Sequence, residues 1–150
     1  AFRDPDHLGR IWPLSTSQLY AVLKRLEHDG LIVGREVSSE NAPPRTEYNI
    51  TASGSVALDI WLNNPHPAPS IRRVRVEFLS RLYITRLLER PVETLIAAQR
   101  AACQAERARL LAESAGSEMG RLANDLVIAQ LDAVIGWIDR CEHLLSPLPR

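Results

Sequence analysis

The sequence predicts a mostly α-helical protein with one small β-hairpin, in which a domain of mixed structure precedes an all-helical one. Three observations lead to this fold class. Apolar residues recur at helical spacing over most of the chain. Two short alternating runs interrupt that spacing and predict two strands. A cluster of prolines then separates the two parts. We therefore expect a first domain at 1–64, a linker at 65–70 and a second domain at 71–150.

The composition excludes several classes of protein. The 150 residues carry 18 basic and 18 acidic side chains and are 45% hydrophobic, which is typical of a globular chain rather than a disordered or fibrous one. No apolar run approaches the ~20 residues that a membrane span needs, and no secretory leader is visible. The two cysteines make no disulfide framework, which favours a cytoplasmic location. A net charge of zero argues mildly against binding to nucleic acid.

The first predicted element is a helix at residues 16–28. Ser15 or Ser17 can accept hydrogen bonds from its first N–H groups, and Asp29 followed by Gly30 ends it. Its apolar residues fall on one side at helical spacing. This inward stripe consists of Leu19, Val22, Leu23 and Leu26.

A hairpin and a second helix complete the first domain. Residues 31–33 are predicted as a short strand, 38–44 as a polar loop and 46–50 as the returning strand. Thr51 then caps a helix that carries Val56, Ile60 and Trp61. Because the chain starts at Ala1 without a helix-start signal, we expect this domain to lack its N-terminal helices.

The second domain is predicted to hold three long amphipathic helices, at 71–90, 91–114 and 121–145. Pro91 suits a first helical turn, and Gly116 and Gly120 bracket a break. Three such helices cannot fully bury one another, so an antiparallel helical homodimer is expected. The expected inward stripes are Val76, Leu79, Tyr83 and Leu87, then Leu95, Ile96, Ala102, Cys103 and Leu110, then Val127, Leu131, Val134, Ile138 and Leu145.

The outward face of the helix at 16–28 suits entry into a DNA major groove. Its residues are small and polar at the start and basic further along, which allows close approach and then phosphate contact. Ser15 with the first N–H groups can hold a phosphate, and Gln18 can pair with adenine if it points into the groove. An ordinary solvated helix face is the alternative. The outward residues are Ser17, Ala21, Lys24, Arg25 and His28, with Tyr20 at the boundary.

The objection from net charge weakens locally. From His7 to Leu26 there are three basic residues and no acidic one. Arg35 and Arg45 follow near the ends of the predicted hairpin, where basic side chains can reach a DNA backbone beside the groove.

Several of these segments resemble one known family. Residues 13–20 (PLSTSQLY), 23–27 (LKRLE) and 29–32 (DGLI) closely resemble the recognition-helix signature of the PadR family of transcriptional regulators. Residues 45–54 resemble the wing-and-return segment of that family, and 71–145 are similar, more loosely, to the helical domain of its larger branch.

The resemblance implies a winged helix-turn-helix DNA-binding domain, a helical dimerisation domain and a repressor that a small molecule releases from its operator. Two features depart from the family. The helices that normally precede Phe2 are absent, and Glu40, Pro43 and Pro44 stand where more basic wing residues are usual. The DNA-binding residues matched in this way are Ser15, Thr16, Ser17, Gln18, Tyr20, Lys24 and Arg45, to which the outward helix face adds Arg25.

No enzyme activity, cofactor or metal site is expected. Cys141 and His143 are two residues apart and do not face each other on a helix. No Gly-rich phosphate loop or paired-carboxylate motif stands out. Among the large aromatic residues, which include Trp12 and Trp61, we expect Tyr83 and Trp137 to be the candidates for stacking on an effector. The alternative for each of these aromatic residues is ordinary core packing.

The function predicted from the sequence is therefore sequence-specific binding to double-stranded DNA by a homodimeric, ligand-responsive repressor with no membrane partner. The alternative is a winged-helix protein-interaction module that uses the same helices for docking and binds no specific DNA.

Overall fold

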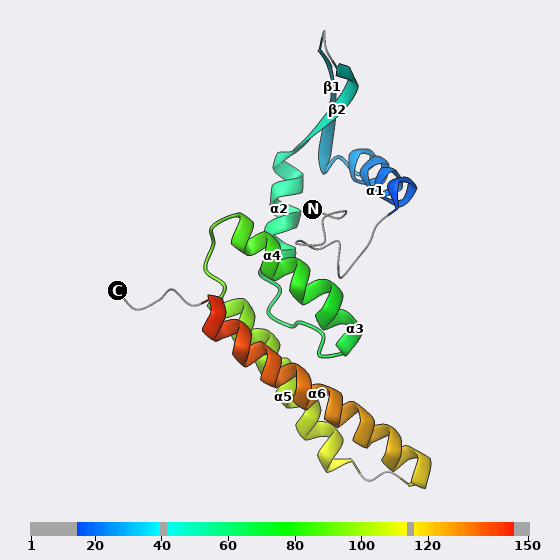
Figure 1. Ribbon diagram of the computed structural model, residues 1–150, viewed down its shortest axis with the longest axis vertical. Helices are drawn as coiled ribbons and strands as arrows, with labels where there is room; N and C mark the ends of the chain where they lie inside the picture. The colour runs from blue at the N-terminus through cyan, green and yellow to red at the C-terminus, as the bar shows by residue number, and fades with distance from the viewer. Residues whose placement is uncertain (1–14, 40–41, 114–115, 146–150) are drawn as a thin grey trace, which may run out of the picture. The chain divides into compact units, whose positions relative to one another are not determined.

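The computed structural model describes residues 15–39, 42–113 and 116–145 (Figure 1). The chain divides into two compact units, residues 1–63 and 64–150. The first unit contains α1 (Thr16–His28), β1 (Ile32–Ser39), β2 (Ala42–Ile50) and α2 (Ala52–Leu62), and the second contains α3 (Ile71–Arg73), the π-helical turn η2 (Val74–Phe78), α4 (Leu79–Leu87), α5 (Glu93–Ala112) and α6 (Glu118–Leu145).

Helix α1 begins and ends on local signals. Ser15 is the N-cap: its hydroxyl accepts from the Gln18 N–H at 3.2 Å, and the Gln18 side chain accepts from the Ser15 N–H at 3.0 Å, which completes a capping box. At the other end Gly30 adopts φ 70°, and the N–H of Leu31 donates to the Leu26 carbonyl. This is the Schellman arrangement that stops a helix at glycine. The predicted bounds of the helix are confirmed, and Ser15 rather than Ser17 is its cap.

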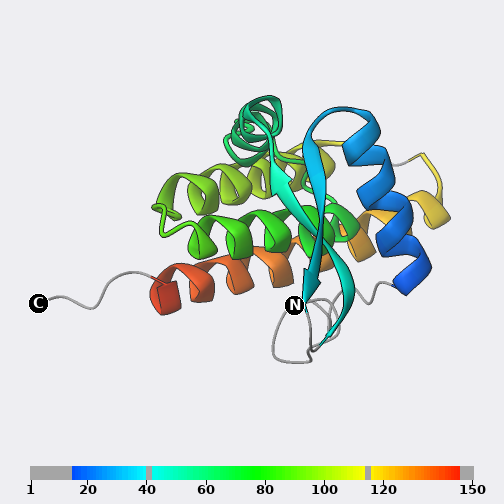
Figure 2. The same cartoon turned by 90° about the horizontal axis from the view of Figure 1, so that it is seen from above.

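The hairpin is longer than the sequence predicted. β1 and β2 pair antiparallel from Ile32 opposite Ile50 to Val37 opposite Arg45, with an irregularity between Val37 and Ser39. Figure 2 shows the strong twist of this two-stranded ribbon. The expected short strand at 31–33 and loop at 38–44 were wrong, because main-chain pairing extends through polar residues that carry no alternating apolar pattern. Edge strands also tolerate proline, so the prolines within β2 do not end it.

The start of α2 is fixed against the turn that follows α1. The Thr51 hydroxyl accepts from the Gly54 N–H at 3.0 Å, as predicted for a cap, and donates to the Gly30 carbonyl at 2.7 Å. The Thr51 N–H donates to the Leu31 carbonyl at 3.0 Å. Gly54 is buried, and a Cβ added there would lie 1.9 Å from the Leu31 carbonyl oxygen. The base of the hairpin is therefore held by main-chain contacts that only glycine permits at residue 54.

The helix predicted at 71–90 is interrupted and buries a different face. A π-helical turn separates α3 from α4, and the buried apolar residues are Val74, Phe78 and Leu82. The predicted stripe through Val76, Leu79, Tyr83 and Leu87 was wrong: it lies on the opposite side, and Leu87 is 68% exposed. The segment carries apolar residues on two sides, so helical periodicity alone does not choose between them.

Helices α5 and α6 run antiparallel and lie side by side (Figure 1). Arg100 on α5 bonds to Asp139 and Glu142 on α6, and Arg107 bonds to Asp132, so residues further along α5 meet earlier residues of α6. Between the helices, Ile96, Cys103, Leu110, Leu131 and Ile138 are buried, as their predicted stripes required. Val127, which was also predicted to be inward, is 39% exposed.

The boundaries of these two helices also differ from those predicted. α5 starts at Glu93 with Val92 as its cap, so Pro91 precedes the helix instead of opening it. Val92 is buried in the core, which anchors the cap, and Glu93 suits the positive end of the helix dipole. α6 starts at Glu118, because the Ser117 hydroxyl accepts from the Gly120 N–H at 3.1 Å. Gly120 therefore lies in the first turn of α6 and does not mark a break.

The proline-rich segment before α3 contacts α5. The side chain of Gln99, which is 2% exposed, donates from Nε2 to the Ala68 carbonyl at 3.1 Å. Cys103 lies beside it, with its Sγ 3.9 Å from the Pro69 carbonyl oxygen. Residues 68 and 69 are thus held to the helical core by hydrogen bonds as part of the second unit.

Candidate nucleic-acid interface

Helix α1 presents the two faces that its sequence predicted. The four apolar residues of the inward stripe are half-buried, whereas every candidate DNA-contacting residue from Ser15 to Arg25 is exposed, Tyr20 to 57%. The exposed side of α1 between Ser17 and His28 contains Lys24 and Arg25, and a carboxylate, Glu27, lies at its edge. Such a face can enter a groove with its small residues while its cations lie near phosphates.

The capping box restricts what Ser15 and Gln18 can do. The Gln18 Oε1 atom accepts from both the N–H and the hydroxyl of Ser15, each at 3.0 Å. Only the amide nitrogen of Gln18 is then available to a base, so pairing adenine through both amide groups would require the capping box to break. The Ser15 hydroxyl likewise already accepts from the Gln18 N–H. In this arrangement the main role of both residues is to stabilise the N-terminus of α1.

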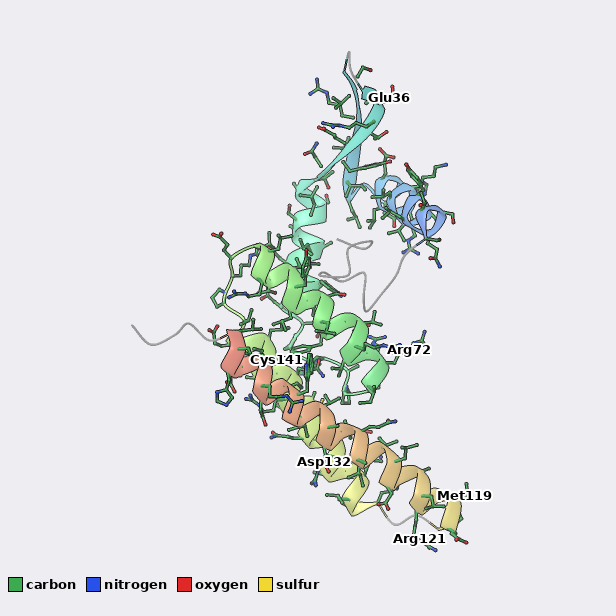
Figure 3. All side chains as sticks on the ribbon, viewed as in Figure 1. Glu36, Arg72, Met119, Arg121, Asp132 and Cys141 are labelled. Carbon is green, nitrogen blue, oxygen red and sulfur yellow. The ribbon has the colours of Figure 1, made fainter. Side chains whose placement is uncertain are left out.

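The arginines of the hairpin lie close to a carboxylate. The Arg45 guanidinium donates to Glu47 Oε1 from Nη2 at 2.7 Å and from Nε at 3.1 Å. Arg35 is the cross-strand partner of Glu47, so the alternation of side chains places all three on one face of the ribbon. Glu36, labelled in Figure 3, belongs to the other face. Arg45 is thus exposed but already paired, which limits its charge toward a phosphate.

One contact of this region was missed by sequence reasoning. The Glu27 Oε1 atom, in the last turn of α1, accepts from the Gly34 N–H of β1 at 2.9 Å. The only sequence signal is an acidic residue that follows the apolar stripe just before the Asp29–Gly30 stop, and such a residue is normally read as a solvated charge. Because the partner is a main-chain group across a turn, the pattern of side chains does not reveal it.

The two proposed effector residues are placed differently by the structure. The Trp137 ring packs edge-on against Phe78, with ring centroids 5.8 Å apart and planes at 87°, and it lies against the hydrophobic core. Tyr83 is half-buried on the other side of the same helical segment from Phe78. The arrangement at Trp137 therefore matches the packing alternative, and Tyr83 and Trp137 stay a prediction as effector contacts.

A hollow of about 780 Å³ lies at the end of the α5–α6 pair where α5 stops and α6 begins. Leu111 and Leu122 line it together with charged side chains, among them Arg121, which Figure 3 labels there. Neither of the two effector candidates belongs to its lining. This position makes it a surface feature of the helix pair rather than a pocket around the candidate aromatics.

Among residues 15–39, 42–113 and 116–145, no three His, Cys, Asp or Glu side chains gather where they could hold a metal ion. Cys103 and Cys141 are free and buried. Within the part of the chain that the structure describes, no helix has the length and apolar character that a membrane crossing requires. Trp12 and the predictions for residues before Ser15 lie outside the described residues.

The described part of the first unit thus consists of a helix followed by a two-stranded wing and a further helix, with exposed cations on α1 and on the wing: Lys24, Arg25, Arg35 and Arg45. Residues 5–60 match the family described as the transcriptional regulator PadR-like family. A curated relative, the negative transcriptional regulator PadR of Bacillus subtilis, is 32% identical over 85 residues, which are 57% of this chain and 46% of that protein. This chain therefore aligns with about half the length of that relative.

Two solved structures are also similar to this chain. The crystal structure of Bacillus subtilis PadR in complex with operator DNA matches 93% of this chain and 84% of its own, at 22% identity and a TM-score of 0.39. The crystal structure of smu.1604c from Streptococcus mutans UA159 matches 89% and 82%, at 21% identity and a TM-score of 0.38. The family that residues 5–60 match is the one that the motifs of the sequence resemble, and it is a family of transcriptional regulators, not of enzymes.

Proposed function

We propose that this protein is a transcriptional repressor that binds double-stranded DNA through α1 and the wing. The observation that carries the proposal is the match of residues 5–60 to the PadR-like family, since it spans the whole exposed face of α1 and the hairpin. The curated relative from Bacillus subtilis is a negative transcriptional regulator, which supports repression rather than activation. The proposal includes a cytoplasmic location, where such a regulator would meet the DNA that it binds.

The proposed contacts follow from the geometry of α1. Ser17, Tyr20 and the other small or polar residues at the start of the exposed face approach the base edges of a major groove. Lys24 and Arg25, further along, contact phosphates and set the register of the helix on the duplex. Ser15 and Thr16 hold the helix start, where N–H groups favour a phosphate. Arg45 adds a wing contact once Glu47 releases it.

The proposal includes a homodimer. Four exposed apolar side chains lie where α5 ends and α6 begins, and we call them the distal patch: Leu111, Met119, Leu122 and Leu126. Monomeric proteins rarely expose such a cluster, so a second copy is its proposed cover. Arg121 and Asp125 line the adjoining hollow, and a twofold pairing would set each beside its opposite in the other copy. Two copies would place two α1 helices on half-sites about one helical turn (~34 Å) apart, or a multiple of it.

A small-molecule effector completes the proposed mechanism. Such a ligand would release the DNA only if it binds more tightly to a form whose two α1 helices no longer match the half-sites. Tyr83 and Trp137 remain the proposed effector contacts. The tight packing of Trp137 on Phe78 means that a ligand reaching it would have to displace a core contact.

The test is a fluorescence-anisotropy titration of the full chain on the promoter DNA of its own gene and on a scrambled duplex of the same length. The proposal expects tighter binding to the promoter at moderate salt. Lys24→Ala should lower the slope of log K against log salt by about one, because one phosphate contact is lost. Equal affinity for the two duplexes would reject specific DNA binding. A dimer without DNA affinity would favour a winged-helix protein-interaction module instead.

A further inference from the structure

Helix α1 and the wing are joined by a hydrogen bond between a side chain and the main chain. Glu27 in the last turn of α1 accepts, through Oε1, from the N–H of Gly34 in β1 at 2.9 Å. Among the residues that the structure describes, β1 pairs with β2 alone, so every second N–H on it faces away from its partner strand. The carboxylate thus satisfies a main-chain donor on the open edge of the hairpin.

The contact depends on glycine at residue 34. A Cβ added there would lie 2.8 Å from Glu27 Oε1, 3.0 Å from Tyr48 Cε1 and 3.1 Å from Thr46 Cγ2. Side chains from α1 and from β2 therefore close around the same main-chain position. Any larger residue at 34 would push the carboxylate or the aromatic ring away, so the three neighbours form a fitted site rather than a chance surface contact.

A second attachment lies at the base of the hairpin. There, Thr51 bonds to the carbonyls of Gly30 and Leu31, in the turn between α1 and β1. A ribbon held only at its base can swing about that point. The Glu27–Gly34 bond adds a holding point two residues into β1, and two points fix the angle between the helix and the ribbon.

The charge of Glu27 makes this placement costly for a DNA-binding surface. The residue is exposed at the edge of the α1 face that carries Lys24, where a carboxylate repels phosphates. We propose that Glu27 is a positioning residue for operator binding, whose carboxylate holds the wing at the angle at which α1 and the wing contact one duplex. This inference rests on the proposed function and adds to it a residue that does not itself touch DNA.

The experiment compares two single substitutions that separate contact from charge. Glu27→Asp keeps the charge but is one methylene too short to reach Gly34. Glu27→Gln loses the charge but keeps a carbonyl oxygen that can accept the same hydrogen bond. Amide hydrogen exchange at Gly34 reports the contact without DNA, and anisotropy titrations on the promoter duplex at several salt concentrations report affinity and salt slope.

Positioning predicts fast exchange at Gly34 in Glu27→Asp, together with about tenfold weaker promoter binding, because without the bond only about a tenth of the molecules hold the wing at the binding angle. The salt slope should fall as wing contacts are lost. Glu27→Gln should keep Gly34 protected and bind at least as tightly as the parent protein. A Glu27→Asp protein that exchanges fast but binds with the parent affinity and slope would overturn the inference, while the parent protein's preference for its promoter would leave the proposed function intact. Equal binding of promoter and scrambled duplex by the parent protein would instead reject the proposed function.

Discussion

At the scale of single residues, the wing shows why the presence of arginine is a poor measure of DNA affinity. Arg45 is 69% exposed, which favours phosphate contact, but its Nε and Nη2 atoms both donate to Glu47 Oε1. Exposed ion pairs of this kind contribute little to stability. Their larger effect here would be on binding, since DNA must compete with the carboxylate for the guanidinium.

Glu47→Gln should tighten binding to DNA and raise the salt slope by up to one, because Arg45 becomes available to a phosphate. Glu36→Gln is the matched control: it removes the same charge from the other face of the same hairpin. Both substitutions reduce general repulsion, so the comparison isolates the release of Arg45. Anisotropy titrations between low and moderate salt measure both quantities, and identical slopes for the two variants would show that Arg45 does not contact DNA.

Cys103 illustrates how burial decides the chemistry of one side chain. Burial raises the pKa of the Cys103 thiol, and a hydrogen bond from Gln99 opposes that shift. The folded state therefore favours the neutral thiol over the thiolate. The stability that this preference contributes is complete below the ordinary thiol pKa of about 8.5 and is lost as the pH rises through the higher folded value.

The free energy of unfolding should accordingly decrease between about pH 8 and pH 10, and less so in Cys103→Ala, which has no thiol at that site. Urea titrations of both proteins at pH 7 and pH 9.5 measure the difference. Cys103→Ala will be less stable at both pH values because it leaves a cavity, so the informative quantity is the change with pH. An equal change in the two proteins would contradict the prediction.

At the scale of elements, the sequence predicted where helices start and stop better than it predicted how long the strands are. The cap at Ser15, the stop at Gly30 and the cap at Thr51 all follow from side-chain or glycine chemistry within a few residues. The hairpin extends beyond its predicted strands because main-chain pairing needs no apolar pattern. Likewise, the π-helical turn at Val74–Phe78 has no signal in the residue pattern.

Two glycines inside helices should respond in opposite directions to replacement by alanine. Gly54→Ala should destabilise the first unit by more than about 2 kcal/mol, because its Cβ would lie 1.9 Å from the Leu31 carbonyl oxygen and the main chain would have to move. Gly136→Ala should stabilise the second unit by about 0.5–1 kcal/mol, since its Cβ meets only Arg140 Nη1 at 3.9 Å and alanine favours a helix interior.

Thermal unfolding followed by circular dichroism checks both changes in the full chain. The two substitutions are matched controls for each other, because each replaces an α-helical glycine with the same residue. A Gly54→Ala protein as stable as the parent would mean that α2 can move away from the turn after α1 without cost.

At the scale of the whole molecule, the net charge of zero limits how much electrostatic attraction can contribute to DNA affinity, but it does not exclude DNA binding. Residues 1–64 carry six basic and eight acidic side chains, so the part proposed to bind DNA is not basic on average. Non-specific affinity comes mainly from neutralised phosphates and should therefore be low. Specificity must then come from the fit of two copies of α1 to two half-sites, which makes the dimer essential to the proposed function.

Leu126→Asp should weaken the dimer, because it places a charge in the distal patch, where Leu126 is 60% exposed. Leu144→Asp is the control: it changes an equally apolar residue, 81% exposed, near the other end of α6. Sedimentation equilibrium over a range of concentrations measures both. A larger loss of dimer in Leu144→Asp would move the proposed interface away from the distal patch.

The sequence by itself determined which segments are helices, where the first helix starts and stops, and that a hairpin follows it, because these depend on contacts within a few residues. The motifs of α1 and the wing also pointed to the family whose model matches residues 5–60. Only the tertiary structure decided which apolar stripe of residues 71–87 is buried, since Val74, Phe78 and Leu82 are chosen by packing against α5 and α6. It alone revealed the Glu27–Gly34 and Arg45–Glu47 contacts. The Glu27–Gly34 contact depends on how β1 lies against α1, and the Arg45–Glu47 pair depends on β2 extending back past residue 45, beyond the strand predicted at 46–50. The order of side chains along the chain specifies neither.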